Sequence, residues 1–505
     1  MTATAATPPH IAEPPTPWLH GLRPVYRLVL RWVVIAALTV LAFHRSLESL
    51  LESTRAGSLN GYIWVVPMAG IMAAIGVARR ERTELPIHDR QTDVIVGIIG
   101  LGVALMVHAV LLQRYATYFH LLRLDLLAMW FFVVSSSVVL FGLRPVTRFA
   151  WVWALLLAVF PLPYQITVIF LGGSRVAAGT GVLLIAAAAT AIAVGRTRSR
   201  GVVGAIGSWA VGLVVLMGIA LVRPSAPVFA YQMIPSVTAI AAVGLALYFL
   251  ARRGTRKRVL DRRLEPLAAK DVWAGLPLVL AVAVALSLVV VPAATSAPTT
   301  WISSMTFGRP LTPPVGWHVT EQTEYDWVRR LYGRDSTLLR QAMVADTGNL
   351  KWDKFSRPRT VIVDSTNTWQ PFSFNVYPAN VLYDIASSRV SDPYPVGLGH
   401  EVTGFMLSVV DDRQLVTWNI LTFQWRNKDS AQRVLIAAVD NHEAQAPFPE
   451  PNGALLPTLG TLFTVLLRGN AVTSNKDPEY KDAEMLTQFG RGLVDAALKG
   501  SETLR

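Results

Sequence analysis

The chain has 505 residues, of which 52% are hydrophobic and only 16% charged, and its formal net charge is +13. This length accommodates a membrane domain and one soluble domain, and the lack of cysteine excludes disulfides, thiolate metal sites and a cysteine nucleophile. The charge does not indicate nucleic-acid binding. Residues 1–294 carry 26 basic and 11 acidic residues, whereas residues 295–505 carry 20 and 22, so the excess lies in the apolar half and favours contact with anionic lipid headgroups.

The first 24 residues are rich in Pro, Ala and Thr, and they predict a disordered cytoplasmic tail rather than a cleavable signal peptide. Residues 25–294 then predict a membrane domain of about nine helices, because each apolar stretch is near the roughly 20 residues that cross a bilayer. The stretches are Val25–Phe43, Gly61–Ala78, Asp93–Gln113, Tyr118–Phe141, Val146–Phe170, Val176–Gly195, Gly201–Val222, Val228–Leu250 and Val272–Val291.

Basic residues fall almost entirely in every second loop. With the N-terminus in the cytoplasm, the inner loops hold 19 Lys and Arg residues and the outer loops hold 5. The positive-inside rule therefore predicts a multi-pass protein of the inner (plasma) membrane with an extracytoplasmic C-terminus. The basic run Arg252–Arg263 fits a topology anchor better than a dedicated lipid or partner site.

A linker at residues 295–314 precedes a predicted extracytoplasmic α+β domain at residues 315–505. Its last helix has apolar residues spaced by three and four, and three strand-like runs separated by short polar breaks predict an antiparallel meander. The expected elements are a helix over Glu321–Tyr332, strands over Arg359–Asp364, Thr403–Val410, Leu415–Trp425 and Arg433–Asp440, and a helix over Glu479–Lys499. Leu455–Leu467 is short for a span, so a buried or surface-lying helix is favoured over a tenth crossing.

Ionisable residues within a bilayer are candidates for function by default. His120, Arg123 and Asp125 lie in the first third of the fourth predicted span, and Arg223 lies at the outer end of another. Arg123 and Asp125 are two residues apart and are not expected to share a helix face, so each calls for a partner on another helix. These residues are candidates for substrate binding, although Arg and His near a span end can also extend to the interface or pair with a neighbour.

Motifs of soluble enzymes are absent, including phosphate loops, His-Glu-x-x-His and nucleophile elbows, and the sequence predicts no metal site and no cofactor. The segment Gly397–Glu401 contains His400 but fits a turn before a strand better than a site. Trp418, Phe423 and Trp425 are expected to be sheet core rather than a binding stripe.

The membrane half resembles the exosortase/archaeosortase family of polytopic transpeptidase-like proteins. The resemblance is carried by Gly61–Pro67 followed by Arg79-Arg80, and by Arg144–Arg148 leading to Phe160-Pro161-Leu162-Pro163. The second half more loosely resembles the extracytoplasmic domain associated with exosortases. This resemblance implies a polytopic fold and a role in the bacterial cell envelope.

The resemblance breaks at the family's cysteine nucleophile. The stretch nearest to the family's Cys-Ser-Gly-like motif is Tyr231–Val237, in which Tyr231 and Ser236 are the candidates for binding, and no histidine lies in the last two spans to act as a base. The sequence therefore excludes the family's cysteine chemistry and leaves open whether any catalysis remains.

The first functional hypothesis is a non-catalytic or altered exosortase-like protein that binds an exported protein or a polysaccharide-assembly partner at its outer face. The alternative is a lipid-linked glycosyltransferase or another envelope-building enzyme, for which Glu48 and Glu52 are available but the usual paired acids are missing. A transporter is disfavoured because the spans show no evident internal repeat.

Overall fold

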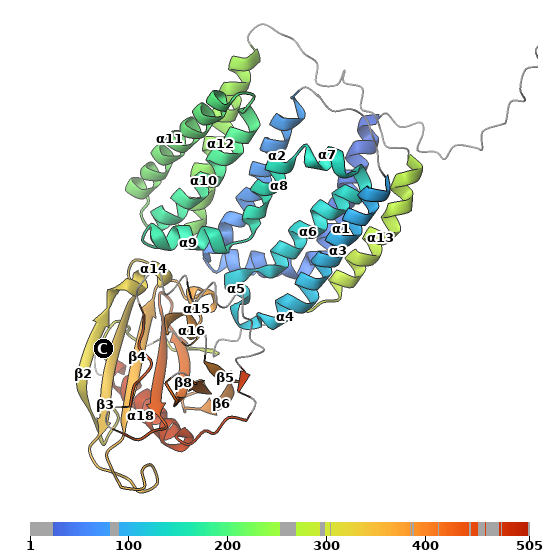
Figure 1. The fold of residues 1–505 in the computed structure, drawn as a ribbon. Helices are drawn as coiled ribbons and strands as arrows, with labels where there is room; N and C mark the ends of the chain where they lie inside the picture. Colours follow the sequence, from blue (N-terminus) through green and yellow to red (C-terminus); the bar gives the residue numbers. More distant parts are fainter. Residues whose placement is uncertain are drawn as a thin grey trace, which may run out of the picture.

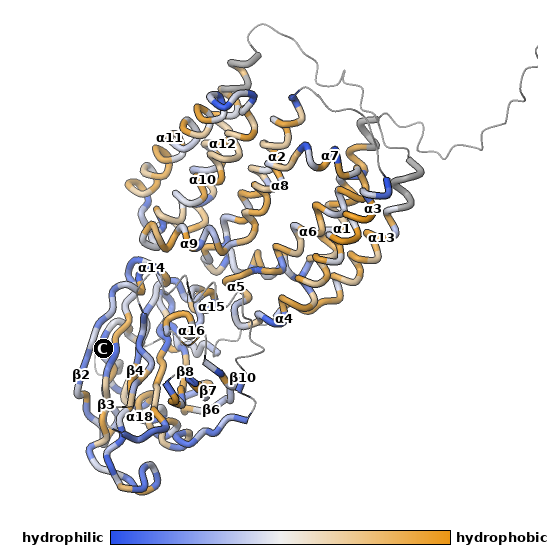
Figure 2. The backbone as a smooth tube through the Cα atoms, viewed as in Figure 1, coloured by the Kyte–Doolittle hydropathy of each residue, from blue (hydrophilic) through white to orange (hydrophobic). Residues whose placement is uncertain are grey.

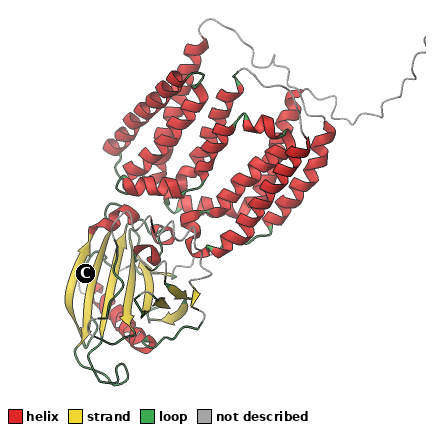
Figure 3. Ribbon diagram, viewed as in Figure 1, coloured by secondary structure: helices red, strands yellow, loops and turns green. Residues whose placement is uncertain are grey.

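The computed structural model describes residues 24–80, 90–252, 269–292, 298–303, 305–383, 385, 388–412, 414–443, 446–452, 460, 474–475 and 477–502. A helical region forms the N-terminal part, and an antiparallel β-sheet domain with helices forms the C-terminal part (Figures 1 and 3). The predicted fold class is confirmed. The expected N-terminal tail, most of the basic run Arg252–Arg263, and Leu455–Leu467 apart from Gly460 lie outside the described residues.

Seven helical segments of the described chain are long and apolar enough to cross a membrane, and a bent helix pair makes an eighth. The ninth predicted stretch forms α13, of which Gly275–Ser287 counts as a shorter apolar helix. The protein is therefore a multi-pass membrane protein. The helices are α1 (Pro24–Arg55), η2 (Leu59–Trp64), α2 (Val65–Ala78), α3 (Arg90–Met106), η3 (Val107–Leu111), α4 (Leu112–Arg114), η4 (Ala116–Tyr118), α5 (Phe119–Leu122), α6 (Leu124–Phe141), α7 (Leu143–Thr147), α8 (Ala150–Leu156), η5 (Leu157–Val159), α9 (Leu162–Phe170), α10 (Arg175–Val194), α11 (Arg198–Val222), α12 (Val228–Arg252) and α13 (Ala269–Ser287).

The fifth predicted span is bent by 69° between its first half, Ala150–Val159, and α9. Phe160 at the bend has an extended backbone, φ −76° and ψ 114°, and Pro161 follows it. Proline lacks an amide hydrogen and disfavours helical geometry in the residue before it, so the helix ends at this point and restarts. As a result α9 lies next to the β domain (Figure 1).

The helices form two groups, one of α2, α8, α10, α11 and α12 and the other of α1, α3, α6 and α13 (Figure 1). Small residues allow close approach in the first group: a Cβ added to Gly76 would lie 2.3 Å from the main-chain oxygen of Ala193. Close contact through glycine is a common way for membrane helices to associate. Large hydrophobic side chains are exposed along α1, α3 and α11. The helical region consists mainly of hydrophobic residues, whereas the β domain contains many hydrophilic ones (Figure 2).

The β domain is built on one sheet with strand order β10-β5-β7-β8-β9-β4-β3-β2, in which β1 pairs with β8 and β6 with β7. The predicted meander is confirmed as β7, β8 and β9, and the expected linker contributes β1, which runs parallel to β8. The strands are β1 (Thr299–Trp301), β2 (Trp317–Tyr325), β3 (Thr337–Ala345), β4 (Thr360–Thr368), β5 (Arg389–Ser391), β6 (Tyr394–Gly397), β7 (Thr403–Asp411), β8 (Val416–Arg426), β9 (Ala431–Val439) and β10 (Ser474–Asn475).

Both faces of the central strands are buried. The predicted C-terminal helix is confirmed as α18 (Ala483–Glu502), and it covers one face with Met485, Leu486, Phe489, Leu493 and Val494. The other face is covered by α14 (Arg329–Tyr332), α15 (Ser373–Val376) and α16 (Ala379–Leu382). Trp418 packs on this second face, whereas Phe423 and Trp425 pack on the α18 face, so all three belong to the core as expected.

The helix predicted over Glu321–Tyr332 is wrong in its first part. Residues up to Tyr325 belong to β2, whereas the rest of the segment is helical, as η6 (Asp326–Val328) and α14. β2 is an edge strand with mostly exposed Glu, Gln and Thr side chains, so its hydrophobic pattern is weak and pairing with β3 decides its conformation. The interpretation of Gly397–Glu401 as a turn is confirmed: it connects β6 to β7, with His400 at φ 48°.

The β domain docks on one end of the helical region through α14, which contacts α9, and α15, which contacts α5 (Figure 1). One hydrophobic cluster runs without interruption from α1, α3, α6 and α13 into the second face of the sheet. A Cβ on Gly173 would lie 2.4 Å from the oxygen of Arg330, so the two parts approach closely here. The helix α7, which carries Arg144, lies at the opposite end of the helical region (Figure 1).

Candidate functional site

Arg123 and Asp125 form a fully buried ion pair with each other. Arg123 Nε lies 3.1 Å from Asp125 Oδ1, and Nη2 lies 2.8 Å from Oδ2. The expectation that these two side chains point to different faces and do not meet is therefore wrong. Arg123 has a left-handed backbone, φ 44° and ψ 51°, between α5 and α6, and this break turns its side chain back onto the first turn of α6.

The surroundings of this pair suit a structural role. Arg123 Nη2 also donates to the main-chain oxygen of Ser46 at 3.0 Å, and its guanidinium lies 4.9 Å from the centre of the Phe119 ring. Removing one member of a buried ion pair costs about 3–5 kcal/mol because the other charge remains uncompensated. The pair thus fixes the junction of α5 and α6 to α1, and a candidate role in binding is left to the neighbouring groups.

A network of neutral polar side chains lies beside this junction, inside the helical region. Gln165 Nε2 of α9 donates to Asn60 Oδ1 at 3.2 Å, and Asn60 Nδ2 donates to the main-chain oxygen of His120 at 3.1 Å. Gln232 Nε2 of α12 donates to Tyr164 Oη at 2.8 Å and to the oxygen of Leu59 at 2.7 Å. The network therefore joins η2, α5, α9 and α12 at the end of the helical region that faces the β domain.

Several acceptors in this network are unused. The Oε1 atoms of Gln165 and Gln232 are buried and have no hydrogen-bond partner among the described residues, and the same is true of Ser236 Oγ, one turn from Gln232 on α12. All three residues are fully buried. A buried polar atom without a partner costs about 1–3 kcal/mol, so this group of acceptors is unfavourable unless something donates to it.

The β domain closes over this end of the network. The ring of Phe372 packs edge-on against His120 at 5.0 Å, and Tyr377 lies near enough to Tyr164 to interact with it electrostatically. Burial raises the pKa of Tyr377 well above its ordinary value, and its hydroxyl has no hydrogen-bond partner among the described residues. Arg433 holds this face in place, because it donates to Tyr332 Oη at 2.6 Å and to the oxygen of Tyr377 at 3.1 Å.

Two of the other predicted residues, Tyr231 and Arg223, lie outside the network. Tyr231 donates to the main-chain oxygens of Arg223 and Pro224 at 3.4 and 3.3 Å, so it stabilises the connection between α11 and α12. The side chain of Arg223 is exposed at the end of α11. His120 contributes its main-chain oxygen and its ring, and Ser236 lies next to Gln232, so these two belong to the site whereas Tyr231 and Arg223 do not.

Asn60, Tyr62, Tyr164, Gln165 and Gln232 were missed, although the sequence held a signal for them. Each lies in, or within two residues of, one of three short segments: Gly61–Pro67 and Phe160–Pro163, which carry the family resemblance, and Tyr231–Val237, where it breaks. The rings of Tyr62 and Tyr164 stack with centres 3.8 Å apart, which brings the first two segments together. Amides within apolar segments were the overlooked sign of this site.

Comparison with protein-family models, with curated proteins and with solved structures finds no match to this chain. In the part of the chain that the structure describes, one group of His and carboxylate side chains has a metal-binding arrangement. It consists of Asp440, His442 and Asp482 in the β domain, and it shares no residue with the membrane network.

Proposed function

We propose that this chain is an exosortase-like protein of the bacterial cell envelope that binds an exported substrate or an assembly partner at its outer face. The single observation that carries the proposal is the buried network of Asn60, Gln165 and Gln232, with the unpartnered Ser236 one helical turn from Gln232. These residues lie in or near the segments that were compared with the exosortase family. They are at the end of the helical region on which the β domain docks.

The chemistry of the network indicates the kind of group it binds. Its unused atoms include the neutral acceptors Gln165 Oε1 and Gln232 Oε1, the Ser236 hydroxyl and His120 Nδ1. Such atoms bind N–H or O–H donors without charge, as offered by peptide amides or sugar hydroxyls. A ligand of this kind would supply the missing hydrogen bonds and offset the cost of burying the acceptors.

Binding fits the site better than covalent catalysis. A serine nucleophile needs a base within hydrogen-bond reach, and Ser236 Oγ has no hydrogen-bond partner among the described residues.

The envelope location rests on the loop charges, which favour an inner-membrane protein with a cytoplasmic N-terminus. Arg144 on α7 belongs to a predicted inner loop, and the β domain docks at the opposite end of the helical region. This placement supports the same orientation.

The alternative of a lipid-linked glycosyltransferase has less support. Glu48 and Glu52, the acids available to it, are exposed along α1 and take no part in the buried network. No observation within the described residues favours this second function.

The test is complementation of a deletion strain. We expect Gln165→Ala and Gln232→Ala to lose most of the rescue, measured as surface-anchored protein and exopolysaccharide output, while the membrane level of the protein stays normal. Ser208→Ala is the matched control, because Ser208 is equally buried but accepts a hydrogen bond from Thr190 between α10 and α11. Full rescue by both glutamine variants would contradict the proposal.

A further inference from the structure

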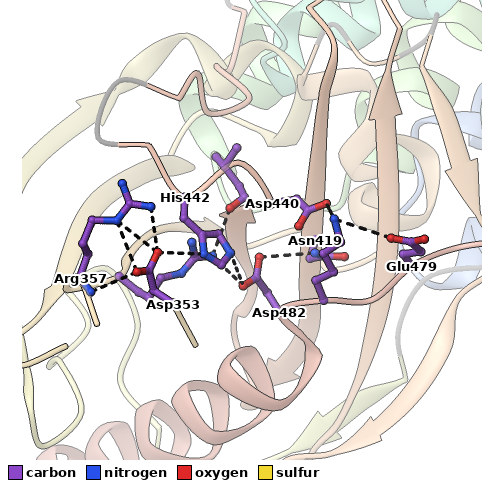
Figure 4. A network of polar contacts seen from close by, with 10 residues as sticks. Asp353, Arg357, Asn419, Asp440, His442, Glu479 and Asp482 are labelled. Carbon is purple, nitrogen blue, oxygen red and sulfur yellow. Dashed lines mark hydrogen bonds and ion pairs between the residues drawn. The ribbon is translucent and has the colours of Figure 1, made fainter. Parts of the chain in front are cut away.

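A second polar cluster lies in the β domain, where the end of β9 meets the start of α18 (Figure 4). Asp440 directly follows β9, His442 comes two residues later, and Asp482 directly precedes α18. Each of these three side chains offers one atom that could coordinate a metal, and the three atoms lie within 4.8 Å of one another. The side chains of Asp440, His442 and Asp482 are 14%, 23% and 2% exposed, so the cluster is largely shielded from water.

The hydrogen bonds around His442 fix which ring nitrogen carries the proton. His442 Nδ1 lies 3.1 Å from Asp353 Oδ2 (Figure 4). Arg357 pairs with Asp353 at 3.0 Å, and the main-chain amides of Phe355 and Arg357 also donate to this carboxylate. With these donors on its other sides, the Asp353 carboxylate acts as the acceptor of Nδ1–H. In the neutral ring Nε2 then keeps its lone pair.

That lone pair faces other acceptors. His442 Nε2 lies 3.6 Å from Asp482 Oδ1, and both Nε2 and Asp440 Oδ1 are buried atoms without a hydrogen-bond partner in the described chain. Nearby, Asn419 is fully buried and also has an unused oxygen, while its Nδ2 lies 3.5 Å from Asp482 Oδ2. Arg359 and Lys481 each donate to one carboxylate oxygen of the cluster, but His442 Nε2 and Asp440 Oδ1 still lack a donor, and a cation bound between them would supply the missing interaction.

Each of the three side chains is also held by an outer partner. Asp353 orients His442, Arg359 Nη2 donates to Asp482 Oδ1 at 2.6 Å, and Lys481 Nζ donates to Asp440 Oδ2 at 2.9 Å. Metal ligands are typically oriented in this way by hydrogen bonds from a surrounding layer, and a carboxylate on the second nitrogen of a ligating histidine is its commonest form. Lys481 occupies only one oxygen of Asp440, which leaves Oδ1 free to coordinate.

We propose that Asp440, His442 and Asp482 bind a divalent transition-metal ion of the Zn²⁺ class in the β domain. One imidazole nitrogen with carboxylate oxygens suits Zn²⁺ and its neighbours better than Mg²⁺ or Ca²⁺, which prefer oxygen ligands alone. Bound there, the ion ties the end of β9 to the start of α18 and fixes that helix on the sheet. The partial exposure of His442 gives the ion access from solvent.

The test uses the full-length protein in detergent, purified with a tag that lacks histidine and treated with a chelator. We expect titration with Zn²⁺ to show one tight site per chain by calorimetry and by metal content. His442→Ala and the nearly isosteric Asp440→Asn should bind at least tenfold more weakly, and Asp353→Asn about 10- to 100-fold more weakly through loss of orientation.

Matched controls come from two other His–Asp pairs. His318 and Asp346 lie 2.6 Å apart and His400 and Asp495 lie 2.8 Å apart, but both pairs are exposed and each histidine has a single acid partner. His318→Ala and His400→Ala should bind Zn²⁺ as the parent does. Thermal melting of the metal-free forms shows which variants are folded, and Zn²⁺ should raise the melting temperature of the parent and the controls only.

Two outcomes would overturn the proposal. One is a parent protein without a stoichiometric tight site. In that case a proton shared between the side chains, rather than a metal ion, would be the cation in the cluster. The other is a folded Asp440→Asn or His442→Ala variant that binds Zn²⁺ as tightly as the parent. Neither outcome bears on the membrane network, because the two sites have no residue in common.

Discussion

Arg123 illustrates how one backbone conformation changes the partners available to a side chain. Within a regular helix, residues two apart point to different faces, and Arg123 could not reach Asp125. The left-handed conformation at φ 44° interrupts the helix and makes the two-hydrogen-bond contact possible. A non-glycine residue in this conformation is strained, and the buried ion pair offsets that strain.

This pairing predicts that single mutations of Arg123 or Asp125 and a combined mutation of both differ in their effect on stability. Arg123→Ala or Asp125→Ala should each lower the free energy of unfolding by about 3–5 kcal/mol, because each leaves a buried charge without its partner. The double change Arg123→Met with Asp125→Leu should cost clearly less than the sum of the single changes. Unfolding in detergent, followed by circular dichroism, measures all three variants.

Arg223→Ala serves as the control, since that side chain is exposed and its change should be nearly neutral. Additive losses in the double variant would show that the two charges are not coupled. The same result bears on function, because a loss of activity in Arg123 variants would be attributed to folding rather than to ligand binding.

At the scale of elements, the close approach of α2 and α10 depends on the absence of a side chain. A Cβ on Gly76 would lie 2.3 Å from the oxygen and 2.4 Å from the Cα of Ala193, which are main-chain atoms that cannot rotate away. The Gly218 position on α11 offers the opposite case, because nothing lies within 4 Å of its added Cβ. Two glycines in membrane helices thus have different roles.

We therefore expect Gly76→Ala to destabilise the helical region by about 1–3 kcal/mol, the usual cost of forcing atoms into a packed space. Gly218→Ala should change stability by less than about 1 kcal/mol, in the favourable direction, because alanine favours a helix more than glycine does. Melting temperatures of the two variants in the same detergent provide the measurement. Equal melting temperatures for both would contradict the packing argument.

Elements also show where the sequence misled. The first part of the helix expected over Glu321–Tyr332 is instead the end of strand β2, because main-chain pairing with β3 outweighs a weak three-and-four spacing of apolar residues. The fifth predicted span is a single apolar stretch in the sequence, and the structure shows that it bends by 69° at Phe160 and Pro161. In contrast, α18 was correctly predicted from apolar residues spaced by three and four, and the meander from strand-like runs separated by short polar breaks.

For the whole molecule, the orientation in the membrane decides where the binding site opens. Because the network and the β domain lie at the same end, both should face the outside if the basic loops stay in the cytoplasm. We expect alkaline phosphatase fused to the C-terminus to be active and a fluorescent protein fused there to be dark. N-terminal fusions of the same reporters should give the reverse, and a C-terminus that fluoresces would contradict this orientation.

The sequence by itself determined the helical membrane domain, the approximate positions of its spans, and the separate β domain. These properties depend on the apolar content and spacing of neighbouring residues, which are local. Only the tertiary structure brought Gln232 to the main chain of Leu59 and Gln165 to Asn60, pairs that are 173 and 105 residues apart. It likewise placed His442 beside Asp353 and Asp482, because contacts between distant segments arise from packing that no local pattern records.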